Sequence, residues 1–234
     1  MKSKIILTPY IRNILWAAPL YFLAPLPFFA LAYLINIEIV AGSVLLGMLG
    51  WWLALLLRIP IILFVKSKKI EQKKSNKLII GFSGPTEEIT RLVLISLIGL
   101  NSNNAYSVGL GWEMIEVVYG LIQIIGIGVL EQKTDAKAEE AKTLMKQMGM
   151  DKSLAPSTPY WGALERVTAT TVHIGHSLLL VFSPYAIIVT IPLHSFINFF
   201  VVKMNRTSIR KSQLSFFIIG CVIFLVGLLL IFFM

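Results

Sequence analysis

Seven apolar stretches, each about as long as a membrane-spanning helix, constrain the fold of this chain more than any other feature. They lie at residues 14–35, 39–65, 78–100, 106–130, 161–181, 185–202 and 214–234. A helix needs about 20 mostly apolar residues to cross the hydrocarbon of a bilayer. With 56% hydrophobic and 14% charged residues and a mean hydropathy of +0.79, the composition lies outside the range of soluble domains. We therefore predict an all-α, polytopic membrane helix bundle of about seven transmembrane helices, with residues 1–234 forming a single integral membrane domain.

The basic residues are sorted between the two sides of this bundle. Of the 21 Lys and Arg residues, all but Arg58, Arg91 and Arg166 lie in the N-terminal segment or in three connecting segments. These basic segments are 66–77, 131–160 and 203–213, whereas the connections at 36–38, 101–107 and 183–185 contain no Lys or Arg. Cytoplasmic loops of membrane proteins are enriched in basic residues, so the alternation predicts an N-in/C-out orientation. The net charge of +9 is thereby explained by topology, and no nucleic-acid partner is expected.

Ionisable residues are concentrated in four consecutive stretches, within residues 78–202. A charged side chain at mid-bilayer costs about 2.5 to 3.5 kcal/mol on insertion scales, so each needs a partner, a water-filled cavity or a function. The stretches within 14–65 and 214–234 have no acid or histidine in their interiors and are predicted to be scaffold helices. The four polar motifs are GPTEEITR (Glu87, Glu88, Arg91), GLGWEMIE (Glu113, Glu116), ERVTATTVHIGHS (Glu165, Arg166, His173, His176, Ser177) and HSFIN (His194, Asn198).

Helical spacing places these residues on shared faces and at similar depth. At 1.5 Å per residue, Glu88 lies roughly 16 Å beyond Lys77, the last basic residue before it. Residues three or four apart lie on one face of a helix. Pairs with this spacing are Glu87 with Arg91, Glu88 with Arg91, Glu113 with Glu116, His173 with His176 and His194 with Asn198. We therefore expect the four helices to bring their polar residues together at one level.

The neighbouring carboxylates Glu87 and Glu88 are the first candidates for catalysis. At low dielectric two adjacent carboxylates do not both ionise readily, so one of them is expected to act as a general base toward water. Arg91 would hold the other carboxylate ionised. The structural alternative is a buried ion pair that braces the bundle. Glu113 could face the same cavity or pair with Arg91.

Residues on the later helices could complete a hydrolytic site. His173 and His194 could position the water, bind a metal or donate to a developing oxyanion. Asn198, one turn from His194, could be an oxyanion donor. His176 and Ser177 could either pack or join the site, and Glu165 with Arg166 could form an interfacial ion pair. Serine-protease and zincin chemistries are disfavoured because the chain has no GxSxG and no HExxH motif.

In these motifs the chain resembles the YhfC-type family of intramembrane peptidases, which is related in pattern to the PrsW proteases and to the CAAX-processing and bacteriocin-processing (ABI) membrane proteases. The resemblance covers residues 80–202, about half of the chain. It rests on EEITR at 87–91, GLGxxxIE ending at Glu116, ERxxAxxxHIxxS at 165–177 and HSFIN at 194–198.

The resemblance implies an intramembrane endopeptidase in the cell membrane of a prokaryote. The expected partners are membrane lipid and a membrane-embedded or membrane-associated peptide substrate. The mechanism is either metal-free or metal-dependent, with zinc as the metal. The catalytic residues that it implies are Glu87, Glu88, Arg91, Glu116, His173, His194 and Asn198, and the metal ligands that it would allow are Glu88, Glu116, His173 and His194.

Two other classes of function remain open. In an ion-coupled transporter, the same carboxylates and histidines would relay ions, and a helix broken at Gly84-Pro85 would suit that role. In a non-catalytic protease homologue, a binding or immunity-type membrane protein, the polar residues would serve assembly alone. Activity of the purified protein separates an enzyme from both.

Overall fold

A computed structural model describes residues 9–147 and 158–233, and these residues are almost entirely helical, with no β-strand in either range. The elements are α1 (Pro9–Leu23), α2 (Leu26–Leu34), α3 (Ala41–Leu56), α4 (Ile59–Ser67), α5 (Gln72–Gly81), α6 (Ser83–Ile98), α7 (Ser102–Gln132), α8 (Ala136–Gln147), α9 (Thr158–Phe182), the 3-10 helix η2 (Pro184–Ala186), α10 (Ile187–Asn205) and α11 (Ile209–Ile231). The predicted all-α class is confirmed. The basic residues before Pro9 and the last residue of the seventh predicted stretch lie outside the described ranges.

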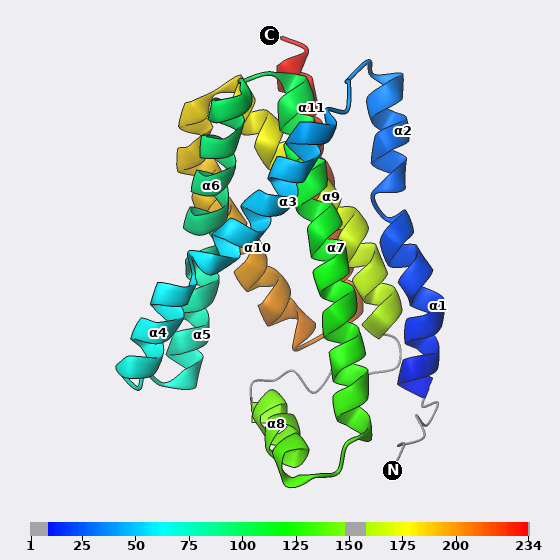
Figure 1. The fold of residues 1–234 in the computed structure, drawn as a ribbon, viewed down its shortest axis with the longest axis vertical. Helices are drawn as coiled ribbons and strands as arrows, with labels where there is room; N and C mark the ends of the chain where they lie inside the picture. The colour runs from blue at the N-terminus through cyan, green and yellow to red at the C-terminus, as the bar shows by residue number, and fades with distance from the viewer. Residues whose placement is uncertain (1–8, 148–157, 234) are drawn as a thin grey trace.

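The helices form an elongated bundle in which successive units alternate in direction (Figure 1). α1 with α2, α5 with α6, α9 and α11 run one way, and α3 with α4, α7 and α10 run the other. The turn between α4 and α5, the short helix α8 and the turn after α10 all lie toward the end at which α1 begins (Figure 1). The basic connections are thus gathered toward one end of the bundle.

Within residues 9–147 and 158–233, five helical units are long and apolar enough to cross a membrane. They are Pro9–Leu34, Ala41–Ser67, Ser102–Gln132, Pro184–Asn205 and Ile209–Ile231. α6 and α9 are not among them, and these are the helices with Glu87, Glu88 and Arg91 and with Glu165 and Arg166. Large apolar side chains cover the outside of the bundle, among them Trp16, Leu49, Ile122, Ile188 and Ile218. Apolar residues outside and ionisable residues inside are the arrangement of a membrane protein.

Breaks in the long units occur beside prolines and direct side chains toward the interior. Proline lacks the backbone donor and clashes with the preceding turn, so it interrupts or kinks a helix. Pro60 follows the joint between α3 and α4, and Arg58 at this joint reaches Thr86 and Glu87 on α6. α5 and α6 are separated at Phe82, just before Gly84 and Pro85.

α9 is the central helix of the bundle and packs against α1, α7 and α11. Glycines allow these helices to approach closely. A Cβ atom at Gly109 of α7 would lie 2.6 Å from Ile174 Cα and 2.7 Å from the His173 carbonyl oxygen on α9. This contact holds α7 and α9 at the short separation at which their polar side chains meet.

Candidate functional site

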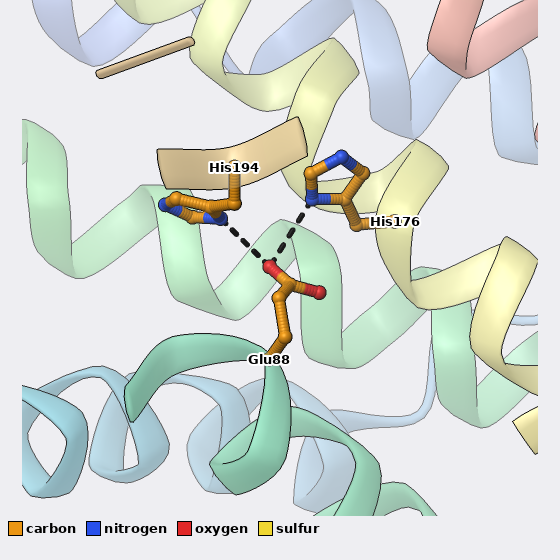
Figure 2. Close-up of side chains that lie close together, drawn as sticks. All are labelled: Glu88, His176 and His194. Carbon is orange, nitrogen blue, oxygen red and sulfur yellow. Dashed lines mark hydrogen bonds and ion pairs between the residues drawn. The ribbon is translucent and has the colours of Figure 1, made fainter. Parts of the chain in front are cut away.

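Glu88 of α6 receives contacts from two other helices in the interior of the bundle (Figure 2). Its Oε1 atom lies 2.7 Å from His194 Nδ1 on α10 and 3.1 Å from His176 Nδ1 on α9. Arg91, one turn along α6, donates from Nη1 to the same oxygen at 2.5 Å. All four side chains are buried, and Glu88, Arg91 and His176 are 0% exposed. One contact from the same helix and two contacts from other helices thus meet at a single oxygen of Glu88.

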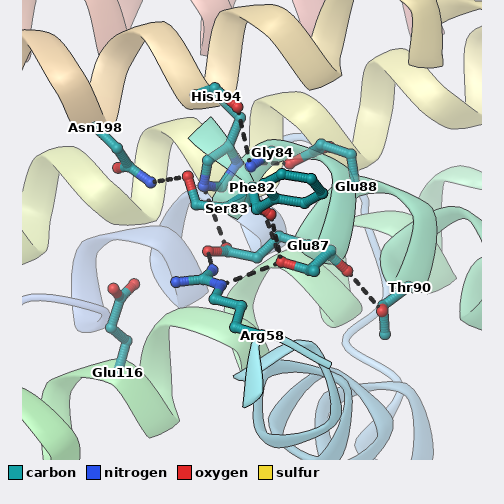
Figure 3. A network of polar contacts seen from close by, with 12 residues as sticks. Arg58, Phe82, Ser83, Gly84, Glu87, Glu88, Thr90, Glu116, His194 and Asn198 are labelled. Atoms are coloured by element: carbon teal, nitrogen blue, oxygen red, sulfur yellow. Dashed lines mark hydrogen bonds and ion pairs between the residues drawn. The ribbon is translucent and has the colours of Figure 1, made fainter. Parts of the chain in front are cut away.

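Glu87 has a separate set of partners (Figure 3). The Arg58 guanidinium pairs with Glu87 Oε1 and also donates from Nε to Thr86 at 3.1 Å. Trp112 Nε1 donates to Glu87 Oε2 at 3.1 Å, and His194 Nε2 lies 3.3 Å from the same oxygen. His194 therefore lies between the two glutamates, with one ring nitrogen toward each.

These side chains form one group that we name the twin-glutamate cluster: Arg58, Glu87, Glu88, Arg91, His176 and His194. Each carboxylate in it is paired with its own guanidinium. The sequence predicts Arg91 as the partner of one glutamate, and it does not predict that Arg58 belongs to the site. A guanidinium within an apolar stretch was the available signal, because such a group needs a partner in a membrane. The contact between Arg58 and Glu87 could not be predicted, because no local helical spacing relates two residues so far apart in the chain.

A second group lies where α7 and α9 meet. His173 Nε2 lies 2.8 Å from Glu116 Oε2. Arg166 Nη1 lies 3.4 Å from both Glu113 Oε1 and Glu116 Oε2, while Arg166 Nη2 donates to Glu165 Oε1 at 3.1 Å. We name this group the Arg166 cluster: Glu113, Glu116, Glu165, Arg166 and His173. Glu113 thus forms an ion pair with Arg166. The pairing with Arg91, one of two possibilities that the sequence leaves open for Glu113, is not found among the described residues.

His173 connects the two clusters in a defined orientation. Its Nδ1 atom lies 2.9 Å from Arg91 Nη2, and a guanidinium can only donate. Nδ1 must therefore accept. A neutral imidazole carries one N–H, so this N–H is on Nε2 and points to Glu116. His173 is accordingly an oriented donor to Glu116 that is held from behind by Arg91.

Two cavities bring the clusters into contact with the outside. A cavity of about 280 Å³ is lined by Asn198 and by polar groups of both clusters, among them Arg58, Glu87, Glu116, His173 and His194. A larger cavity of about 780 Å³ includes Asn76, Leu130, Met145 and Arg206 in its wall. Glu116, Glu165 and Arg166 line both. The larger cavity lies toward the basic end of the bundle and adjoins the polar site, whereas Glu88 is fully buried and sealed from both cavities.

Asn198 contacts the break between α5 and α6 and not the carboxylates. Its Nδ2 atom donates to Ser83 Oγ at 2.8 Å (Figure 3). Ser195, on the same helix, accepts from Gly84 N at 3.1 Å and donates to the Gly81 carbonyl at 2.7 Å. The HSFIN motif therefore both anchors α10 to this break and directs His194 to the glutamates. Ser177 donates to the His173 carbonyl of its own helix at 2.9 Å, a structural contact.

The expected metal ligands are distributed over two separate sets. Glu88 and His194 group with His176, and Glu116 and His173 group with Glu113. Within each set, one candidate donor atom per residue lies within 4.8 Å of the others. A single ion held by His173 and His194 together is therefore not the arrangement that the side chains favour. The histidine that the sequence left between packing and function, His176, belongs to the first set.

Comparison with known proteins adds no identity to this geometry. No family model matches the sequence, and searches of curated proteins and of solved structures found no match. The chemistry of the site is therefore argued from the two clusters and the cavities alone.

Proposed function

We propose that this chain is an intramembrane endopeptidase of the glutamate type, which hydrolyses peptide bonds at or within the membrane. The observation that carries the proposal is the 280 Å³ cavity, whose wall combines Glu87, His194, Asn198 and Arg58. A carboxylate–imidazole pair and fixed hydrogen-bond donors around one small cavity are the equipment for activating water and stabilising an oxyanion. The motif resemblance to the YhfC-type peptidases points to the same chemistry.

The His194 and Glu87 pair would accept the proton of the attacking water. Glu88, held by Arg91, accepts from His194 Nδ1–H and so orients the ring, as a buried carboxylate does in a hydrolytic triad. His194 Nε2 then faces Glu87 Oε2 and the cavity. The sequence suggested Glu87 or Glu88 as the base. With Glu88 sealed, we assign it the positioning role and assign proton transfer to Glu87 with His194.

The other wall groups would stabilise the developing oxyanion. The oxygen of water bonds to the scissile carbonyl carbon, and the carbonyl oxygen gains negative charge. Asn198 and the cationic Arg58 line the same cavity and can donate to this oxygen. The proton that His194 and Glu87 removed from water then passes to the leaving amine, and the C–N bond breaks. Glu116 and His173 also line this cavity.

We further propose seven membrane crossings with an N-in/C-out orientation, in the cell membrane. The five apolar units, together with the α5–α6 unit and α9, would make this number, and the alternating directions of the units support it. The substrate would then come from the cytoplasmic side through the larger cavity. A helix about 10 Å wide with a rise of 1.5 Å per residue fills roughly 120 Å³ per residue, so this cavity holds a segment of about six residues. That volume suits a peptide end or an unwound segment.

The test is peptide cleavage by the purified protein in lipid nanodiscs. Wild type, Glu87→Gln, His194→Gln and the control Glu71→Gln, an exposed carboxylate on the turn before α5, are incubated with a peptide library and analysed by mass spectrometry. We expect Glu87→Gln and His194→Gln to lower the cleavage rate by about 100-fold or more, and Glu71→Gln to leave it unchanged. Cleavage that persists in both site variants would contradict the proposal.

An ion-coupled transporter is the second candidate, and one observation favours it. Contacts run without interruption from cavity-lining Glu87 through His194 to the sealed Glu88, and all three side chains can gain and lose a proton. Such a chain could relay protons toward the centre of the bundle. Folded wild-type protein that cleaves none of the library, but acidifies the lumen of reconstituted vesicles under a pH gradient, would favour this function over hydrolysis.

A further inference from the structure

The two clusters differ in charge. In the twin-glutamate cluster, two carboxylates face two guanidiniums. In the Arg166 cluster, Glu113, Glu116 and Glu165 share the single guanidinium of Arg166. Three ionised carboxylates with one guanidinium leave two negative charges without a permanent counter-charge among the described residues. An excess of this kind is costly in the interior of a membrane protein unless a cation balances it.

Glu113 is the side chain at which the lack of a partner is clearest. It is 0% exposed, and neither of its oxygens accepts a hydrogen bond from any residue that the structure describes. Its ion-pair distance to Arg166, 3.4 Å, is longer than the charge-assisted hydrogen bonds of Glu87 and Glu88. Buried polar groups in folded proteins normally have a partner, so a buried carboxylate without a donor indicates a missing one. Its neighbours in the cluster, Glu116 and His173, have donor atoms within 4.8 Å of its own.

The available donor atoms select the kind of cation. His173 Nε2 carries the ring N–H, because Nδ1 accepts from Arg91, and so Nε2 has no lone pair for a metal. The remaining ligands are carboxylate oxygens of Glu113 and Glu116, with water from the cavity that Glu116 lines. One or two carboxylates with several waters form the coordination sphere that Mg²⁺ and Mn²⁺ prefer.

We infer that the Arg166 cluster binds a hard divalent cation such as Mg²⁺ or Mn²⁺ between the carboxylates of Glu113 and Glu116, with water as the further ligands. One such ion balances the two excess charges. It reaches the site through the larger cavity, whose wall includes Glu116, Glu165 and Arg166. The twin-glutamate cluster is the poorer site, because a divalent ion there would add charge to a group that is already balanced. The inference does not depend on peptide hydrolysis.

The experiment measures Mn²⁺ binding to the full chain in lipid nanodiscs, free of metal at the start. Thermal unfolding is followed with and without Mn²⁺ for wild type, Glu113→Gln and His176→Gln, the last being the matched change in the other three-donor set. At a concentration 100-fold above Kd we expect Mn²⁺ to raise the melting temperature of wild type by about 5 °C or more. We expect the same rise in His176→Gln, none in Glu113→Gln, and a reversal of the rise by excess EDTA.

Electron paramagnetic resonance of bound Mn²⁺ identifies the donors. We expect one bound ion per chain, competition by Mg²⁺ and no coupling to an imidazole nitrogen. A rise that is lost in His176→Gln would move the ion to Glu88, His176 and His194 and overturn the assignment. Nitrogen coupling would overturn the oxygen-only donor set. An equal melting temperature with and without Mn²⁺ in wild type, with Glu113→Gln folded and as stable as wild type, would show that Glu113 carries a proton instead.

Discussion

The twin-glutamate cluster and the Arg166 cluster are built from the same three residue types, yet their partners are arranged differently. Glu87 and Glu88 each have a guanidinium and at least one further nitrogen within hydrogen-bonding distance. Glu113 shares one guanidinium with two other carboxylates and accepts no hydrogen bond from the residues that the structure describes. The first cluster is thus balanced in charge, although Glu88 Oε2, Arg91 Nε and His176 Nε2 have no hydrogen-bond partner among the described residues. The second cluster requires a further positive charge.

The comparison of the two clusters shows that burial alone does not identify a binding site. Glu88 and Glu113 are equally sealed, both at 0% exposure, and both lie in the centre of the bundle. A buried carboxylate whose charge is matched by a guanidinium is a positioning element, whereas one that accepts no hydrogen bond at either oxygen is a place for a ligand or a proton. Removal of a carboxylate charge should therefore lower the stability of the protein when the carboxylate is in the twin-glutamate cluster, and raise it when the carboxylate is in the Arg166 cluster.

Arg91→Leu should have the largest effect, because it leaves Glu88 as an uncompensated buried charge. We expect the free energy of unfolding to fall by about 3 to 5 kcal/mol, measured by chemical unfolding in mixed micelles. The double variant Glu88→Leu with Arg91→Leu is the control and should recover most of the loss, since it removes both charges. A loss under about 1 kcal/mol in the single variant would show that charge pairing does not hold the twin-glutamate cluster together.

Gly109→Ala tests the packing that brings the Arg166 cluster together. Its new methyl group would meet Ile174 Cα and the His173 carbonyl and push α7 away from α9. We expect a loss of about 1 to 3 kcal/mol in unfolding free energy in the same assay. Gly126→Ala on the same helix is the matched control, because a Cβ there meets nothing within 4 Å. Equal stabilities of the two variants would mean that α7 and α9 can separate freely.

Glu113→Gln should have the smallest effect, and in the opposite direction. Without metal, removal of one excess charge should raise the unfolding free energy by about 1 kcal/mol. Glu88→Gln is the comparison, and it should lower stability because it weakens the pairing with Arg91 and the hydrogen bonds from two histidines. Thermal unfolding of both variants in metal-free nanodiscs measures the difference. Changes of the same sign would remove the distinction between the clusters.

Local patterns predicted much of the fold. Apolar length predicted the helices, and the helix break considered at Gly84-Pro85 agrees with the separation of α5 from α6. Helical spacing also predicted that Glu88 and Arg91 would share a face, and they form an ion pair at 2.5 Å. These features depend on the chain within one or two turns, where geometry is set by the helix itself.

The partners from distant parts of the chain were beyond such reasoning. Arg58 and Trp112 hold Glu87, and Arg166 holds Glu113 and Glu116, but no local spacing relates these residues. A tryptophan in an apolar stretch, such as Trp112, is most simply a membrane anchor or a packing residue. The buried indole N–H of Trp112 instead donates to Glu87. Which residues face one another across a bundle depends on helix rotation and crossing, and these follow from packing.

An all-helical chain with apolar helices suited to a membrane follows from the amino-acid sequence, as does the set of residues that are too polar to face lipid. The division of these residues between two clusters follows only from the packing of the helices: Glu87 and Glu88 with two arginines, and Glu113, Glu116 and Glu165 with one. The physical reason is the range of the forces. Hydrophobicity and helix geometry act on each residue and its near neighbours, whereas ion pairs in a buried interior depend on distances of a few ångströms between separate helices.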